Sequence, residues 1–402
     1  MAEKREIVFV GAVRTGIGDY GGTLKDFAPT DLGARVIKEA LARANVDPAQ
    51  VGHVVMGNII HTEAKDMYLS RVAMINAGIQ SIVTAANVII LGDADCAVAG
   101  GAESMSRALY SLPAGRWGAR MNDTKLIDMM VGALTDPFDT VHMGVTAENV
   151  AARHGITREM QDAFAVESHK RAAAAAAAGR FKDQILPIEI QSKKGTIQFA
   201  ADEHVRGDVT VEGLGKLKAV FKKDGGVTAG NASGINDAAA AVVLMEAGAA
   251  AKAGAKPLAR LVAYAYAGVE PAYMGEGPIP AVRKVLDRAG LKLSDIDLIE
   301  SNEAFAAQAL AVSKNLDFDS ARTNPNGGAI ALGHPLGMSG ARLVLTAVHQ
   351  LERTGGRYGL ATLCVGVGQG AALALLRCRV PCGQASRAAR APARPPCFSA
   401  GG

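Results

Sequence analysis

The chain has 402 residues, of which 49% are hydrophobic, enough to bury a large core or two similar domains. Lys plus Arg outnumber Asp plus Glu by 43 to 39, but five arginines and no acid follow residue 376, so the preceding chain carries only −1. These values exclude a wholly disordered protein and disfavour nucleic-acid binding, which needs a basic face on the folded domain. With 4% aromatic residues and 46 glycines, we expect an α/β fold, in which helices pack closely on a parallel sheet.

The N-terminal residues run directly into a buried-strand pattern at 7–10, which leaves no room for a signal or transit peptide. The longest apolar run near a helix, residues 82–91, is far shorter than a membrane span. Before residue 378 the only cysteines are Cys96 and Cys364, which fits a reducing compartment. We therefore expect a cytoplasmic protein with no membrane partner.

Two stretches of the chain repeat. Residues 36–57 resemble 282–301, each with an amphipathic helix, a short acidic turn and a buried strand. A helix over 79–91 with a strand at 95–99 resembles a helix over 339–351 with a strand at 358–363. The offset is 245 for the first pair and about 263 for the second. The repeat therefore indicates that the first half is shorter than the second between these landmarks, by roughly the difference of the two offsets.

Residues 108–230 lie between the two halves and predict an inserted lid or binding surface. The Ala-rich segment 158–178 predicts a helix, because Ala is the best helix former. After Leu376 the sequence loses its apolar period, which predicts disorder. The predicted units are an N-terminal half (1–107 with about 231–258), a loop domain (108–230), a C-terminal half (259–376) and a tail (377–402).

Three Gly-rich segments of the second half lie at or near predicted strand ends, where α/β proteins place their sites. They contain Asn302, His334 and Cys364. A thiol, an imidazole and an amide on neighbouring loops supply an activatable sulfur and hydrogen-bond donors for an oxyanion. The glycines allow backbone N–H groups to approach a carbonyl.

The chain resembles the thiolase family over residues 5–376, in particular its bacterial β-ketothiolase and acetyl-CoA acetyltransferase branch. The resemblance depends on the three Gly-rich segments and on residues 99–106, 142–144 and 228–234. The resemblance implies an αβαβα sandwich of two similar five-stranded halves with an inserted loop domain, assembled as a homotetramer or dimer. A ketoacyl synthase relative is disfavoured, because such proteins use a different histidine pattern.

The resemblance also implies a reversible Claisen condensation of acyl-CoA, with CoA thioesters as substrates and no bound cofactor. Cys364 would be the general acid and base, His334 and Asn302 would bind the thioester oxygen, the latter through a water, and the Gly366 N–H would join a second oxyanion hole. The CoA-binding residues would be Ser233, His142, Met143, Ala304 and Phe305 along the pantetheine channel, with Lys218 where the family often has an Arg near the CoA phosphates. No metal is expected, because the histidines lack paired ligand spacing.

One departure concerns the acyl-accepting cysteine, which the family carries in a Cys-Gly-Ser-Gly-type loop before the helix at 79–91. Here Gly78 joins Ile79 directly, so the loop is missing and no nucleophile is assigned. Cys96 is expected to be an inert, buried strand residue. We expect acyl transfer to be impaired and stability lowered; the alternative is an inactive CoA-binding or oligomer-forming homologue. Val367, where the family has Gly, and the Arg/Pro/Ala tail are further departures.

Overall fold

A computed structural model shows the chain folded around one mixed sheet, and it describes residues 5–78, 85–192 and 195–378. The strands of this sheet are β1 (Ile7–Thr15), β2 (Gly18–Asp19), β3 (His53–Gly57), β4 (Cys96–Ser104), β7 (Ile185–Leu186), β10 (Asn236–Glu246), β11 (Ala259–Gly268), β12 (Leu298–Ser301), β13 (Tyr358–Gly366) and β14 (Gln369–Arg377). The main path runs β12-β13-β14-β11-β1-β10-β4-β3, with β2 beside β10 and β7 beside β1.

Among the described residues, the path divides into two groups of four strands with the same pattern, which confirms the predicted similarity of the halves, although the resemblance implied five strands in each half. β3 pairs parallel with β4, and β12 pairs parallel with β13. In each group the remaining neighbours are antiparallel. The halves meet where Val8 and Phe9 of β1 pair with β11. The continuous Ala and Val run of β10 is buried on both faces, as expected for a central strand.

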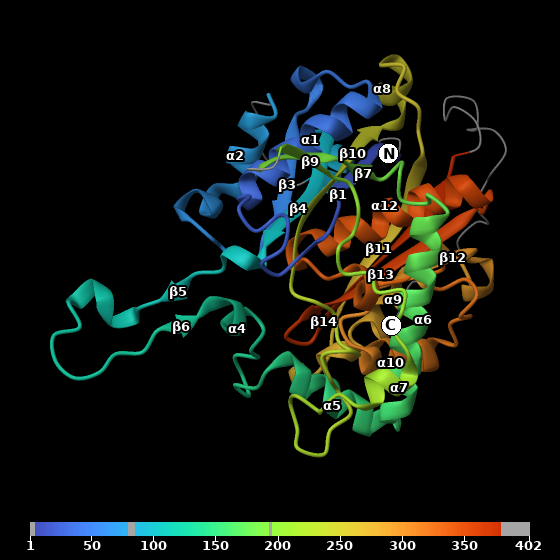
Figure 1. Cartoon of the computed structure of the whole chain (residues 1–402). Coiled ribbons are helices and arrows are strands. Elements are labelled where there is room, and N and C mark those ends of the chain that lie inside the picture. The colour runs from blue at the N-terminus through green and yellow to red at the C-terminus, as the bar shows by residue number, and fades with distance from the viewer. Residues whose placement is uncertain (1–4, 79–84, 193–194, 379–402) are drawn as a thin grey trace, which may run out of the picture.

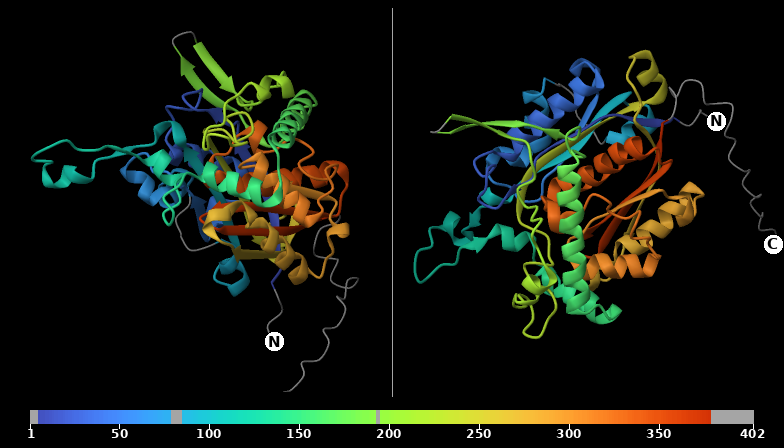
Figure 2. Two further views of the ribbon diagram at one scale, coloured as in Figure 1. Left: turned by 90° about the horizontal axis from the view of Figure 1, so that it is seen from below. Right: turned by 45° about the vertical axis from the view of Figure 1, so that its right-hand side comes forward.

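Helices form three layers around these half-sheets (Figure 2). α12 (Leu336–Thr354) lies in the middle and packs against β4 and β10 of one half and β12 and β13 of the other. α1 (Pro29–Ala44) covers the N-terminal half, and α9 (Pro278–Ala289) covers the C-terminal half. The result is the five-layered α/β sandwich that the resemblance implied.

The remaining helices are α2 (Leu69–Asn76), α3 (Ala85–Leu91), α4 (Met129–Ala133), α5 (Met143–His154), α6 (Arg158–Ala177), α7 (Val211–Gly215), α8 (Ala247–Lys252), α10 (Ala306–Leu316) and α11 (Ala329–Leu332). Within the described ranges, no helix combines the length and apolar character needed to cross a bilayer. The predicted helix over 79–91 is seen only as α3, because residues 79–84 lie outside the described ones. Arg377, predicted to begin the disordered tail, instead ends β14, where it pairs with Ala259; residues 379–402 of that tail lie outside the described ranges.

The segment 108–230 lies mostly outside the main sheet. Its first part projects from the body as an arm, seen at the left of Figure 1, and is held by the pairing of β5 (Tyr110–Ser111) with β6 (Ile127–Asp128). α5 and α6 then pack against α10 of the C-terminal half, and β8 (Ile188–Ser192) pairs with β9 (Gly195–Phe199). This segment therefore brings α5 and its neighbouring loops to the C-terminal half.

The two halves differ in length between their paired parallel strands. In the C-terminal half the chain from 302 to 357 connects β12 to β13, whereas in the N-terminal half the chain from 58 to 95 connects β3 to β4. The connection 58–95 is shorter than the connection 302–357, and the difference in length matches the difference between the two offsets of the sequence repeat, 245 and about 263. The longer connection adds a bridge from Thr323 to Ile299 outside β12, whereas β3 is the last strand of its edge among the described residues.

Candidate active site

A pocket of about 760 Å³ opens between the end of β13, the loop before α12 and the intervening segment. Eight of the ten residues predicted for the site line it: Cys364, Gly366, His334, Ser233, His142, Met143, Ala304 and Phe305. Asn302 is fully buried and contacts His334. Lys218 is not among the lining residues.

Cys364 lies near the end of β13 with 6% of its surface exposed. Burial raises the pKa of its thiol to about 12, so the sulfur is protonated at neutral pH in the unliganded chain. After a bulge at Cys364, the turn to β14 has positive φ at Gly366 (81°), Val367 (52°) and Gly368 (80°). A β-branched residue in this region of φ is strained. The structure thus gives a reason why glycine suits position 367.

His334 precedes α12 and is fixed at both ring nitrogens. Its Nδ1 lies 2.6 Å from Ser339 Oγ, and its Nε2 lies 3.2 Å from Asn302 Nδ2. Burial, with a smaller contribution from the Arg342 charge, lowers the pKa of His334 to about 4, so the ring is neutral at pH 7. Asn302 follows β12 directly, so the sheet edge and the α12 loop bring amide and imidazole together.

The opposite wall joins three segments that are distant in sequence. The Ser233 N–H donates to the Ala304 carbonyl, and Ala232 forms a bridge with Phe305. His142 caps α5 by accepting the Gly144 N–H at Nδ1, so its neutral ring carries the proton on Nε2. The same ring stacks on Phe221 with centroids 4.6 Å apart. These contacts build a mostly apolar wall with a few fixed polar groups.

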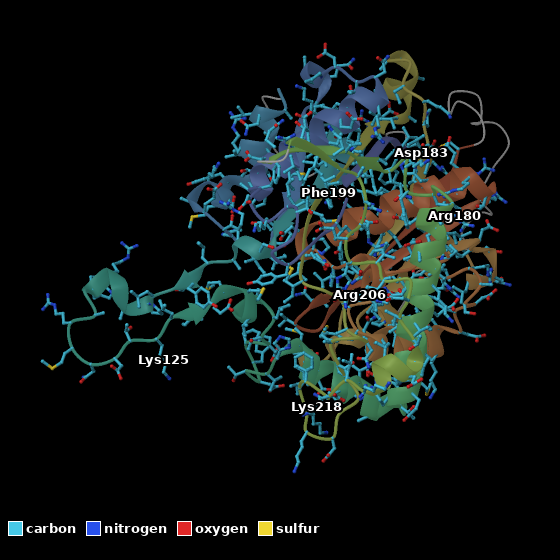
Figure 3. All side chains as sticks on the ribbon, viewed as in Figure 1. Lys125, Arg180, Asp183, Phe199, Arg206 and Lys218 are labelled. Atoms are coloured by element: carbon cyan, nitrogen blue, oxygen red, sulfur yellow. The ribbon has the colours of Figure 1, made fainter. Side chains whose placement is uncertain are left out.

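The cation that lines the pocket is Arg206 rather than Lys218. Both side chains are exposed: Lys218 lies on the loop after α7 and Arg206 on the segment before it, and Figure 3 labels both. Sequence reasoning missed Arg206, because a single Arg in a polar loop carries no distinguishing pattern. It also missed Phe221, whose packing explains Gly144: a Cβ on Gly144 would come within 2.2 Å of that ring.

Cys364 is the only cysteine among the described residues that line the pocket. Cys96 is 1% exposed within β4, where burial raises its pKa to about 12, and it packs in the N-terminal core. The junction after Gly78, where the nucleophile loop is predicted to be missing, borders residues outside the described ranges. Across 5–78, 85–192 and 195–378, no cluster of three His, Cys, Asp or Glu side chains has a geometry suited to a metal ion.

The α/β fold thus has two repeated halves around a central helix and brings a thiol, an imidazole and an amide together at one pocket. The chain belongs to the thiolase family of acyltransferases: the family described as "Thiolase, N-terminal domain" matches residues 7–248, and "Thiolase, C-terminal domain" matches 255–377. Both the predicted family and the predicted fold are therefore confirmed.

Named relatives agree with this assignment. The chain is 57% identical to the β-ketothiolase BktB of Cupriavidus necator over 386 residues, covering 92% of this chain and 98% of the relative. It is 50% identical to an acetyl-CoA acetyltransferase of Syntrophomonas wolfei, with coverage of 92% and 98%. The crystal structure of human mitochondrial 3-ketoacyl-CoA thiolase superimposes with a TM-score of 0.91 at 43% identity, covering 93% of this chain and 99% of that one.

The match to the β-ketothiolase also contains a length difference. It spans 386 residues, yet it covers only 92% of the 402 residues here. Several positions of the relative therefore have no counterpart in this chain. The number of these unmatched positions of the relative is close to the number of residues by which the connection 58–95 is shorter than the connection 302–357.

Proposed function

We propose that this chain binds CoA thioesters and retains the group that deprotonates the α-carbon, but is impaired in condensation and thiolysis because it lacks an acyl-accepting thiol. Cys364 serves as general acid and base, and His334 and Asn302 hold the thioester oxygen. The Gly366 N–H serves the second oxyanion hole. CoA contacts Ser233, His142, Met143, Ala304 and Phe305, while Arg206 supplies a positive charge; Lys218 remains a second candidate for the phosphates.

The observation that carries this proposal is that Cys364 is the single cysteine among the described residues that line the pocket. Thiolysis breaks the C2–C3 bond of a β-ketoacyl-CoA after a thiol attacks C3, and the released acetyl-CoA enolate takes a proton from a second thiol. One thiol cannot hold the acyl group and also exchange the C2 proton. Cys96 does not line the pocket, and the shorter connection of the N-terminal half supports the loss of the segment that carries the nucleophile in the family.

The first test follows the enolate absorbance of acetoacetyl-CoA after CoA is added to the purified chain. We expect no loss of absorbance above that of the C364A variant, which controls for contaminating enzyme. Turnover that C364A abolishes would overturn the proposed impairment. In parallel, acetyl-CoA is incubated in deuterium oxide, and we expect deuterium to enter its methyl group with the chain but not with C364A.

A second candidate function is that of an inactive CoA-binding or oligomer-forming homologue, and the projecting arm favours it. This arm exposes Trp117 (78%) and Met121 (85%), and exposed apolar side chains of this size favour a protein partner. Calorimetric titration with CoA separates the two functions when combined with the exchange assay. Binding without deuterium incorporation would favour the inactive homologue.

We also propose a homotetramer or dimer in the cytoplasm, with CoA and acyl-CoA as its small-molecule ligands and no resident cofactor. The exposed arm supports the oligomer, and the bacterial relatives support the cytoplasm. Light scattering of the purified chain tests the oligomer: a monomer at all concentrations would contradict it. We further propose the domain division 1–107 with about 231–258, 108–230, and 259–376; the limits of the two matched families, at residues 248 and 255, lie near the proposed end of the N-terminal half and support it.

A further inference from the structure

A further histidine, His204, lines the pocket on the segment before α7. Its Nδ1 lies 2.6 Å from Oδ1 of Asp19, which also lines the pocket. A carboxylate only accepts hydrogen bonds, so the ring donates from Nδ1. In the neutral ring Nε2 is then unprotonated and is an acceptor. Among the described residues, the ring forms no other hydrogen bond.

A chain of contacts places His204 between the two ends of the proposed CoA site. Asn236 of β10 accepts the His334 N–H at 2.9 Å, and its Nδ2 lies 3.5 Å from Asp19 Oδ1. Asn236 and Asp19 are also paired in register where β10 meets β2. On the other side, Arg206 follows His204 by two residues and lines the same pocket. His204 therefore lies between the histidine proposed for the thioester and the cation proposed for the phosphates.

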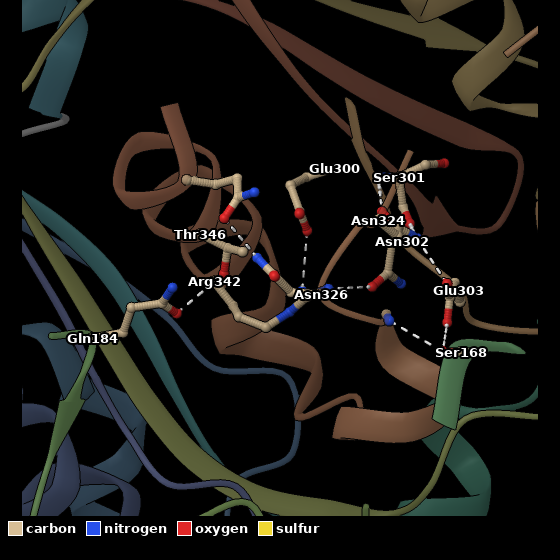
Figure 4. Close-up of polar contacts among 12 residues, drawn as sticks. Ser168, Gln184, Glu300, Ser301, Asn302, Glu303, Asn324, Asn326, Arg342 and Thr346 are labelled. Carbon is tan, nitrogen blue, oxygen red and sulfur yellow. Dashed lines mark hydrogen bonds and ion pairs between the residues drawn. The ribbon is translucent and has the colours of Figure 1, made fainter. Parts of the chain in front are cut away.

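The space behind Asn302, the partner of His334, is filled by buried polar side chains. Arg342 Nη2 lies 3.5 Å from Asn302 Oδ1, and Glu300 and Thr346 are buried beside it (Figure 4). None of these three side chains lines the pocket. A ligand held at His334 therefore extends along the pocket, where His204 lies.

We propose that His204, aligned by Asp19, binds the pantetheine arm of CoA by accepting one of its amide N–H groups at Nε2. This inference rests on the proposed function, which places the thioester at His334 and the phosphates near Arg206. The pantetheine arm joins these two parts of CoA and carries amide N–H groups. Such a group is the donor that an unprotonated imidazole nitrogen requires.

Two neighbours keep the His204 ring in place and its Nε2 open to a ligand. A Cβ at Gly234 would lie 2.9 Å from Nε2, so only glycine leaves this edge of the ring free. His169 accepts the Arg206 N–H at Nδ1, at 3.2 Å. Burial lowers the pKa of His169 to about 4, with a smaller contribution from the His204 charge, so this nitrogen stays unprotonated at pH 7. The segment is thus held between Asp19 and His169 before CoA binds.

Two substitutions separate ligand binding from a structural role. A Gln side chain places its amide where Nε2 lies, whereas Asn places its amide where Nδ1 lies. H204Q therefore keeps an acceptor for the ligand but loses the contact with Asp19, and H204N does the reverse. In calorimetry at pH 8.5, we expect CoA to bind about fivefold more weakly to H204N and H204F, and to change by less than about twofold in H204Q. The control H154F removes a ring that lies 2.9 Å from Glu276 outside the pocket, and it should bind CoA like the wild type.

Pantetheine alone identifies the part of CoA that His204 contacts, because it lacks the phosphates and the adenosine. The wild type is labelled with ¹⁵N at its histidines, and H204Q and H204F assign the His204 ring among the eight histidines. We expect pantetheine to move the resonance of the unprotonated Nε2 upfield, as for an imidazole nitrogen that accepts a hydrogen bond. This measurement on the wild type decides the inference even where a variant fails to fold.

Three results would overturn the inference while leaving the proposed function intact. The first is a shift of Nε2 with CoA but none with pantetheine, which would place His204 at the phosphates or the adenosine. The second is unchanged CoA affinity in folded H204N and H204F. The third is weaker binding in H204Q than in H204N, which would make the contact with Asp19 purely structural. A wild type that binds no CoA would overturn the proposed function and this inference with it.

Discussion

Asn231 offers a sharp test of how the pocket wall is held, because one isosteric change replaces a hydrogen-bond donor with a titratable carboxyl. The side chain is fully buried and accepts the Thr228 N–H at 2.8 Å. Its Nδ2 donates to Asp162 Oδ1 at 2.8 Å and to the Gly226 carbonyl at 2.9 Å. These bonds hold the loop that carries Ser233. N231D would keep the first bond and place a second carboxylate against Asp162.

The structure limits the size of this effect. Two unit charges 2.8 Å apart repel by about 6 kcal/mol at an effective dielectric of about 20. Protonating the introduced carboxyl, with an ordinary pKa of about 3.9, costs only about 4 kcal/mol at pH 7, so protonation is preferred. Losing the bond to the Gly226 carbonyl adds about 1 kcal/mol. We therefore expect a loss of about 5 kcal/mol at pH 7.

The loss should depend on pH with a defined sign. The folded-state pKa of the introduced carboxyl lies above its unfolded value, so the variant loses stability as pH rises, by about 1.4 kcal/mol per unit. At pH 5 the deficit should be about 2 kcal/mol. N231A introduces no titratable group and should show a nearly constant deficit of about 2–4 kcal/mol.

Circular dichroism melts of wild type, N231D and N231A between pH 5 and 8 measure these differences. At about 2 cal/mol/K per residue, a loss of about 5 kcal/mol lowers the Tm by about 6 °C in a chain of this length. The single tryptophan is a poor reporter, because Trp117 is 78% exposed on the arm. A pH-independent deficit in N231D, or one equal to that of N231A throughout, would refute the reasoning.

Three further predictions concern other parts of the site. Because Val367 has φ of 52°, we expect V367G to be more stable than V367A by about 1 kcal/mol in melts, the reverse of the usual order. A Cβ on Gly101 would lie 1.8 Å from the Gly337 carbonyl oxygen at the start of α12, so G101A should lose about 3 kcal/mol, whereas G132A, with nothing within 4 Å, should change by less than about 0.5. Burial lowers the pKa of His334 to about 4, so the folded state is destabilised as pH falls below 6.5, the pKa of an ordinary histidine. Between pH 7 and pH 4, chemical denaturation should show the free energy of unfolding of the wild type falling by up to about 3 kcal/mol more than that of H334Q. Equal losses in the two proteins would contradict this.

Much of the architecture could be predicted, because the two halves repeat the same helix-and-strand pattern. The buried strand predicted at the end of 282–301 is β12 (Leu298–Ser301), and the predicted helix at 339–351 lies within α12. The unequal length of the two halves was also visible in the sequence before any strand was placed. Repeats reveal architecture well because each copy supports the interpretation of the other.

Parts of the site were hidden from the sequence because they depend on which loops meet in space. Arg206 and Phe221 line the pocket, yet each is a single residue in an irregular segment with no periodicity around it. The contact of Arg342 with Asn302 joins residues 40 positions apart. Motifs identified the residues at strand ends, whereas the charges and rings that surround them required the tertiary structure.

The shortened connection also raises the question of how the edge of the N-terminal half-sheet is closed. In the C-terminal half, the Asn324 side chain accepts the Ser301 N–H and donates to the Ser301 carbonyl. With the offset of 245, Met56 of β3 is the residue equivalent to Ser301. The Ser70 hydroxyl of α2 accepts the Met56 N–H at 3.0 Å and donates to the Met56 carbonyl at 3.2 Å. A hydroxyl from the adjacent helix thus satisfies backbone groups that an added edge segment satisfies in the other half. Because unpaired edge groups are costly, these bonds from Ser70 let the sheet tolerate the shorter connection of the N-terminal half.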